Sequence, residues 1–162
     1  MAPPMVIRLD PADPLHARAM LALLDEYAAG PTGRGHGLEP QARERLPAML
    51  AARPHYWGCL AFVDGEPAGF ANCFETVSTF LAEPLLNIHD IAVSPRFQRR
   101  GVGTALLAAV EAAARERRCC KLTLEVLEGN HGARRLYERA GFDDYALDPR
   151  MGRAGFMEKK LA

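Results

Sequence analysis

The feature that most constrains the fold is a strand, a loop, a helix and a second strand in immediate succession. An apolar run from Leu85 to Val93 predicts the first strand, and apolar positions at helical spacing predict a helix over 103–118. Leu122, Leu124 and Val126 then alternate with polar residues, which is typical of a strand with one buried face. Because parallel strands need a long crossover, usually a helix, this order predicts at least one parallel strand pair.

Earlier segments supply the rest of the sheet. The sequence predicts, in order, a strand at 6–9, helices at 14–28 and 40–52, and strands at 56–63 and 67–74. Pro47 is expected to kink or end the second helix, because proline lacks the N–H that an inner turn needs. Asp64 and Gly65 tolerate positive φ and separate the two strands, which predicts a tight hairpin.

After the parallel pair, the sequence predicts one more helix and one more strand. Residues 131–140 form the helix, and Gly141 follows where a left-handed cap is favoured. A final strand is expected near Gly155–Leu161. This order predicts an α/β chain with a mixed sheet and about four helices.

Length and charge narrow the range of functions. With 162 residues, 49% of them hydrophobic, the chain is expected to form one domain over 1–162. Its 20 basic and 20 acidic side chains cancel, which argues against nucleic acid as a partner. No segment reaches the roughly 20 apolar residues of a membrane span, and the N-terminus lacks the features of a secretory signal. We therefore expect a cytoplasmic chain with no membrane partner.

The four cysteines are expected to be free thiols. Cys59, Cys73, Cys119 and Cys120 form no Cys-x-x-Cys pair and have no companion ligands at metal-binding spacing, so no metal is expected. Buried, unreactive thiols are the favoured interpretation, and a nucleophilic cysteine is the alternative.

The segment 94–103 is suited to binding an anion. Gly101 and Gly103 let backbone N–H groups approach a phosphate, and the following helix adds unpaired N–H donors and the positive end of its dipole. Three arginines would add positive charge: Arg96, Arg99 and Arg100. The competing interpretation is a glycine-bearing turn with a solvated basic face. Because the chain has no Walker sequence and carries Leu106 where a dinucleotide loop needs a small residue, neither ATP nor NAD is expected.

Two motifs in this half of the chain resemble those of the GNAT superfamily of acyl-CoA N-acyltransferases. The first, Gln98-Arg99-Arg100-Gly101-Val102-Gly103-Thr104, is similar to the family's Gln/Arg-x-x-Gly-x-Gly/Ala loop. The second runs from Asn130 through Ala133 to Tyr137, is followed by Gly141-Phe142, and is similar to the family's Asn-x-x-Ala-x-x-x-Tyr motif. The resemblance runs from 86 to 142.

The resemblance implies an acetyl-CoA site between two splayed central strands, at 86–93 and 120–127. The pantetheine arm would lie between them and pair with backbone groups of Ile91 and Val93, on either side of Ala92. The backbone from Gln98 to Thr104 would hold the diphosphate, and Asn130 and Ala133 complete the implied cofactor-binding set.

Tyr137 stands at the family's tyrosine position, and the resemblance implies that it acts as an acid toward the departing thiolate. General acid–base help is worth about 10²–10⁴ in rate for such transfers. Because Tyr137 also shares one helix face with Ala133, Leu136 and Ala140, simple packing is the competing interpretation.

The general base has several candidates. His89 and Asp90 lie on the strand before the loop, where related enzymes often hold a glutamate, and His89 stands nearest that position. A neutral imidazole accepts a proton near pH 7. Asp90 would orient that imidazole or bind a cationic acceptor, and Glu125 is a third candidate. For each of them, a satisfied polar residue on a strand is the competing interpretation.

The expected activity is transfer of an acetyl group from acetyl-CoA to a primary amine by direct attack through a tetrahedral intermediate. The acceptor would be a small molecule, polyamine-like or amino-acid-like, or a protein amine, shaped by residues 14–53 and 75–87. Six acids lie there and would suit a polyamine or amino-sugar cation, or are solvated surface: Asp25, Glu26, Glu39, Glu44, Glu75 and Glu83. The alternatives are a non-catalytic acyl-CoA-binding sensor and an interaction domain without a ligand. Exposed strand edges often pair, so a homodimer is a further expectation.

Overall fold

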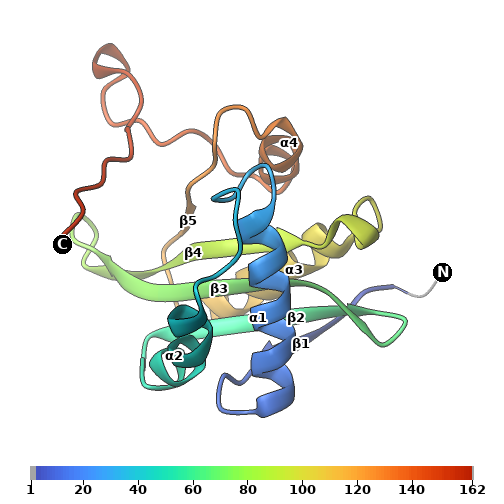
Figure 1. Ribbon diagram of the computed structural model, residues 1–162. Helices are drawn as coiled ribbons and strands as arrows, with labels where there is room; N and C mark the ends of the chain where they lie inside the picture. The colour runs from blue at the N-terminus through green and yellow to red at the C-terminus, as the bar shows by residue number, and fades with distance from the viewer. Residues whose placement is uncertain (1–2, 162) are drawn as a thin grey trace.

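The computed structural model describes residues 3–161 and contains a five-stranded sheet with helices on both faces (Figure 1). The strands are β1 Met5–Leu9, β2 Tyr56–Val63, β3 Glu66–Ser78, β4 Glu83–Val93 and β5 Leu122–Leu124. The helices are α1 Pro14–Ala29, α2 Pro40–Ala51, α3 Val102–Glu116 and α4 His131–Arg139, and two 3₁₀ turns are η1 Pro95–Phe97 and η2 Pro149–Met151. This α/β architecture confirms the predicted fold class.

The sheet is mixed, as the order of elements predicted. The strands lie in the order β1-β2-β3-β4-β5, and every neighbouring pair is antiparallel except β4 and β5. The hairpin between β2 and β3 turns at Asp64 and Gly65, with φ of 53° and 80°. The positive φ of both residues confirms the turn predicted from this residue pair.

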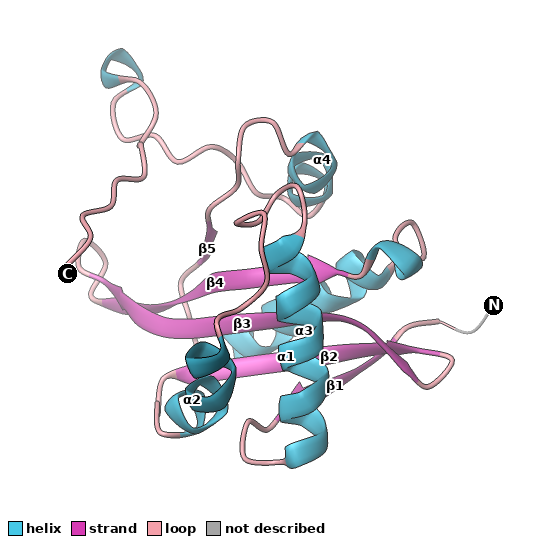
Figure 2. Cartoon of the chain, viewed as in Figure 1, coloured by secondary structure: helices cyan, strands magenta, loops and turns pink. Residues whose placement is uncertain are grey.

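Alternating side chains of the strands form a core on each face of the sheet. On one face, Leu60 and Phe70 pack with residues of α1 and α2, such as Met20. On the other face, Cys59 and Ala71 pack with α3 and with Tyr137 of α4. Figure 2 shows α1 and α2 in front of the sheet and α3 behind it. The two faces therefore present different helices to any ligand that reaches the sheet.

Three details of the predicted fold change in the structure. Residues 155–161 form no strand, because no described strand lies beside them to accept their backbone hydrogen bonds, and Phe156 and Met157 are exposed. The strand predicted at 120–127 is only the three-residue β5. The second helix continues through Pro47 to Ala51, so proline does not end it. Apolar alternation alone does not make a strand, because a strand also needs a neighbour with which to pair.

Within residues 3–161, no helix combines the length and the apolarity that crossing a bilayer would require. Residues 1, 2 and 162 of the domain predicted over 1–162 lie outside the described residues.

Candidate functional site

The two parallel strands β4 and β5 pair over three residues and then separate. Leu86, Asn87 and Ile88 lie opposite Leu122, Thr123 and Leu124. The Asn87 side-chain amide donates to the Thr123 hydroxyl at 2.9 Å and fixes this short contact. Beyond Ile88, β4 continues to Val93 without a described partner on its β5 side. The backbone of 91–93, predicted to pair with the pantetheine arm, thus lies along an open edge.

A β-bulge lies at the point where the two strands separate. The register between β3 and β4 shifts from Asn72 opposite Asp90 to Cys73 opposite Ile88, which leaves His89 as the extra residue. Successive residues of a regular strand point to opposite faces, and a bulge breaks that alternation. As a result, both His89 and Asp90 line one pocket on the face covered by α1 and α2.

That pocket has a volume of about 260 Å³ and is called the bulge pocket below. Its apolar walls come from both helices and from β3: Leu24, Leu46, Met49, Leu50 and Phe74. Its polar lining is Arg53, Asn72, His89 and Asp90. The His89 ring meets the Phe74 ring edge-on, with centroids 5.6 Å apart, and makes no hydrogen bond to a described residue. The structure thus brings together two of the three predicted base candidates, His89 and Asp90, and adds residues that the sequence did not single out.

A chain of hydrogen bonds holds the Asp90 carboxylate from inside the sheet. The Tyr56 hydroxyl donates to Asn72 Oδ1 at 2.8 Å, and Asn72 Nδ2 donates to Asp90 Oδ2 at 3.1 Å. Asn72 is 2% exposed. Burial is the main cause that raises the pKa of Tyr56, which keeps its hydroxyl protonated and able to donate. The sequence signal for these hydrogen bonds was Asn72 itself, a single asparagine in the apolar run of β3, since a buried amide needs hydrogen-bond partners.

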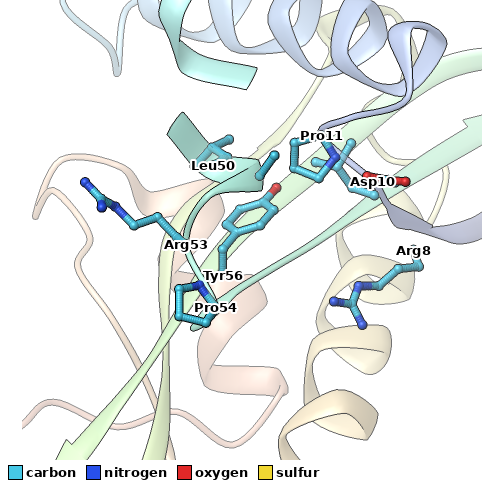
Figure 3. A pocket seen from close by; sticks show the side chains of 9 residues that line it. Arg8, Asp10, Pro11, Leu50, Arg53, Pro54 and Tyr56 are labelled. Carbon is cyan, nitrogen blue, oxygen red and sulfur yellow. The ribbon is translucent and has the colours of Figure 1, made fainter. Parts of the chain in front are cut away.

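A second, more open pocket of about 400 Å³ lies beside Tyr56 (Figure 3). In that view the Tyr56 ring lies between Arg53 on one side and Asp10 and Arg8 on the other, and the Arg53 side chain extends away from Asp10. Leu50 and Arg53 line both pockets. Arg8 lies over the Trp57 ring, 5.6 Å from its centroid. None of the three predicted base candidates lines this second pocket.

The loop after β4 contains two residues in left-handed conformation. Arg99 has φ of 60° and Gly101 has φ of 78°, and Gly101 is the N-cap of α3. Gln98, Arg99 and Gly101 are exposed, whereas Val102 is anchored in the core with 1% exposure. Such a turn at a helix N-terminus presents backbone N–H groups outward, which suits an anion.

The three arginines of this segment are placed differently from one another. Arg96 pairs with Glu66 at 2.9 Å and Arg100 with Asp64 at 3.2 Å, so acids of the β2–β3 hairpin offset both charges. Their guanidinium groups lie 5.2 Å and 5.5 Å from the centroid of the buried Phe97 ring. Arg99 makes no ion pair with a described residue and is the least compensated of the three cations.

Tyr137 lies on α4 with its ring in the core and its hydroxyl free. The residue is 8% exposed, and its ring packs against Phe142 with centroids 5.9 Å apart. Its hydroxyl has no hydrogen-bond partner among the described residues. Every fully buried side-chain oxygen of those residues does have a partner, so the Tyr137 hydroxyl is not fully buried and reaches solvent. Burial first, and Tyr27 of α1 second, raise the pKa of Tyr137 to about 12. The ring of Tyr137 therefore packs in the core, and its role as an acid stays a prediction.

The remaining predicted residues support the backbone around α4. Asn130 is the N-cap of α4, and its Oδ1 accepts from the Ala133 N–H at 3.2 Å. A Cβ on Gly103 would lie 2.7 Å from Leu136 Cδ2, so this glycine allows α3 and α4 to pack closely. Glu125 lies just beyond β5, is exposed, and does not line the bulge pocket. Gly141 has φ of 91° and follows the helix as predicted.

Comparison with known proteins places the chain in a family. The model of the acetyltransferase (GNAT) family matches residues 18–142. An uncharacterized N-acetyltransferase of Methanocaldococcus jannaschii is 40% identical over 85 residues, which is 51% of this chain and 37% of that protein. The chain thus matches little more than a third of the length of that curated relative.

Solved structures share the fold at low sequence identity. A probable acetyltransferase has a TM-score of 0.80 and 19% identity over 98% of this chain and 99% of its own. An aminoglycoside N-acetyltransferase solved in complex with CoA has a TM-score of 0.75 and 19% identity, over 98% of this chain and 95% of its own. The family match covers most of the sequence and the architecture agrees with it. The chain therefore belongs to the acetyltransferase (GNAT) family, a family of acyltransferase enzymes.

Proposed function

We propose that this protein transfers an acetyl group from acetyl-CoA to a primary amine. The observation that carries the proposal is the separation of β4 from β5 after Ile88. It lies beside the bulge at which both His89 and Asp90 line the same pocket. An open backbone edge for the donor and a mostly apolar pocket with His89 and Asp90 in its lining for the acceptor meet at that point. Family membership and the CoA complex of a structural neighbour support the same donor.

Donor binding uses the backbone more than side chains. The open edge at Ile91–Val93 pairs with the amides of the pantetheine arm, and the N–H groups of the loop from Gln98 to Thr104 hold the diphosphate. Arg99 supplies the uncompensated charge, since the hairpin acids already offset Arg96 and Arg100. The roles of Asn130 and Ala133 are indirect, because both fix the start of α4.

Starting from the ammonium, two protons leave nitrogen, one before the attack and one from the tetrahedral intermediate, while one proton reaches sulfur and the other passes to solvent. The amine nitrogen attacks the thioester carbonyl carbon, and the carbon–sulfur bond of the tetrahedral intermediate then breaks to release CoA. An alkylammonium has a pKa of about 10.4, so it must first lose a proton. We assign that step to His89 and Asp90, which line the same pocket, with His89 as acceptor and Asp90 as the carboxylate that attracts the cation.

Tyr137 acts at the sulfur. Its pKa of about 12 keeps the phenol protonated throughout the neutral range. A thiol has a pKa of about 8.5, so full proton transfer from such a phenol to a solvated thiolate is uphill. We therefore assign Tyr137 first as a hydrogen-bond donor to the developing thiolate. Transfer of the phenol proton to sulfur is favoured only if burial makes the thiolate more basic than the Tyr137 phenolate.

A direct experiment separates this function from that of a non-catalytic acyl-CoA sensor. Acetyl-CoA is incubated with a panel of primary amines while free thiol is followed, and CoA binding is measured by calorimetry in parallel. The expected result is CoA binding together with thiol release that depends on the amine. Binding without acceptor-dependent release would favour the sensor, and no binding at millimolar CoA would overturn both.

A further inference from the structure

The bulge pocket is mostly apolar but contains one permanent charge of each sign. Asp90 lies at the bulge, with its Oδ2 bonded to Asn72. Arg53 follows the C-terminal end of α2 and makes no ion pair with a described residue. A ligand that fills this pocket therefore meets Asp90 and Arg53, neither of which makes an ion pair with a described residue.

Three of the six acids that would attract a polycation are engaged elsewhere, and none of the six lines the bulge pocket. Asp25 accepts from the Leu38 N–H at 2.7 Å and pairs with Arg43, which lowers its pKa. Glu26 accepts from Ser94 Oγ at 3.2 Å. Glu75 pairs with Arg117 at 3.5 Å. Among the described residues, Asp90 is the sole carboxylate that lines the bulge pocket. Because Arg53 offsets its charge, the lining has no net negative charge to attract the several ammonium groups of a polyamine.

We propose that the acceptor is a small, amino-acid-like primary amine with an apolar body and one acidic group. Its nitrogen lies beside Asp90 and His89, its acidic group beside Arg53, and its body against Leu24, Leu46 and Phe74. This assignment rests on the acetyltransferase function proposed above and specifies its acceptor. The volume of about 260 Å³ lies below the roughly 300–1,000 Å³ of pockets for drug-sized ligands, which suits a compact molecule.

The same charges argue against other amines. A polyamine would place a second ammonium close to Arg53, and like charges at short distance disfavour binding. An amino acid amide keeps the body and the nitrogen but lacks the group that pairs with Arg53. Because the amide also has a less basic α-amine, the change in this discrimination when Arg53 is substituted is what reports on Arg53.

The test compares kcat/KM for leucine, methionine and phenylalanine with that for their carboxamides and for putrescine and spermidine. The wild-type chain is expected to favour the free acids by about tenfold or more, the usual scale for a hydrogen bond to a charged group. Arg53→Gln should remove most of this preference by raising KM for the acids, and Arg53→Glu should reverse it. Arg45→Gln, an exposed arginine of α2 outside the pocket lining, is the matched control and should keep the wild-type preference.

The outcomes separate this inference from the function on which it rests. Acetylation of carboxamides or polyamines as fast as of the acids would overturn the acceptor assignment and leave the acetyltransferase function standing. An acid preference that persists in Arg53→Gln would overturn the role of Arg53. Absence of acetylation of every amine in the panel, with CoA bound, would overturn the function itself and this inference with it.

Discussion

The side-chain amide of Asn72 donates to Oδ2 of Asp90 at 3.1 Å and ties a buried residue of β3 to the carboxylate at the bulge of β4. The same amide group accepts from Tyr56, so one asparagine connects a buried phenol to the candidate site. An Asp90 carboxylate held in this way keeps a fixed direction toward the pocket.

Replacing Asn72 with alanine is expected to reduce kcat/KM about tenfold, because Asp90 loses the donor that orients it. Stability should also fall by about 1–3 kcal/mol, since the Tyr56 hydroxyl is left without an acceptor. Tyr56→Phe should have a smaller effect on kcat/KM, because the Asn72 to Asp90 bond survives. Ser78→Ala, a buried polar change at the far end of β3, controls for general destabilisation. Full activity in a destabilised Asn72→Ala would make Asn72 purely structural.

Tyr137→Phe should lower kcat by about 10²–10⁴ while CoA affinity changes little. The melting temperature should stay close to the wild-type value, because the ring still packs on Phe142 and the hydroxyl makes no hydrogen bond to a described residue. Calorimetry, thermal melting and steady-state kinetics measure the three quantities. Phe142→Leu is the matched control, because it disturbs the packing and keeps the hydroxyl. Equal kcat in Tyr137→Phe and the wild type would leave Tyr137 as packing alone.

Arg99 has a positive φ that L-residues disfavour by roughly 1–2 kcal/mol, so Arg99→Gly should be more stable than Arg99→Gln. Both substitutions remove the same charge and should weaken CoA binding to the same extent. A melting temperature that is higher for glycine, with equal CoA dissociation constants, would separate the backbone effect from the electrostatic one. Unchanged CoA affinity in both variants would argue against a role of this charge in binding.

Gly101→Ala and Gly103→Ala should destabilise the loop for different reasons. At Gly101 a Cβ meets no atom, so the cost comes from φ of 78° alone, about 1 kcal/mol. At Gly103 the cost comes from the contact with Leu136, so Leu136→Ala should partly rescue the Gly103 variant and not the Gly101 variant. Denaturant unfolding of the single and double variants measures this coupling. Equal rescue of both glycine variants would contradict the assignment.

The free energy of unfolding should decrease as the pH rises above 9. Burial raises the pKa of Cys59 from 9.0 to about 12 and that of Tyr137 from 10.0 to about 12, and it also raises the pKa of Cys73. Because these groups deprotonate more readily in the unfolded chain, their stabilising contribution is complete below pH 9 and is lost as the pH rises toward 12.

Thermal melting between pH 7 and pH 10.5 tests this dependence. Cys59→Ala should start from a lower melting temperature and fall less steeply with pH, since one buried thiol is gone. Val63→Ala removes buried side-chain atoms from the same strand without an ionisable group and should keep the wild-type slope. Identical slopes in all three proteins would contradict the contribution of Cys59.

The sequence by itself determined most of the elements and singled out the loop proposed to bind the donor. Periodicity located four helices and all five strands, and the residue pair Asp64-Gly65 predicted the hairpin that the structure contains. Glycine at 141 predicted the left-handed residue that follows α4, although nothing in the residue type predicted the same conformation at Arg99. These features are local, since they depend on backbone preferences and on spacing along the chain.

The tertiary structure alone decided the acceptor side of the site and the end of the chain. A bulge is a relation between two strands, so no pattern within β4 predicted that His89 and Asp90 would share one pocket. The same holds for the bonds from Tyr56 through Asn72, and for the engagement of Asp25, Glu26 and Glu75 by neighbours distant in sequence. The strand predicted near Gly155–Leu161 does not form in the described chain, because strand formation depends on a neighbour that the sequence pattern does not reveal.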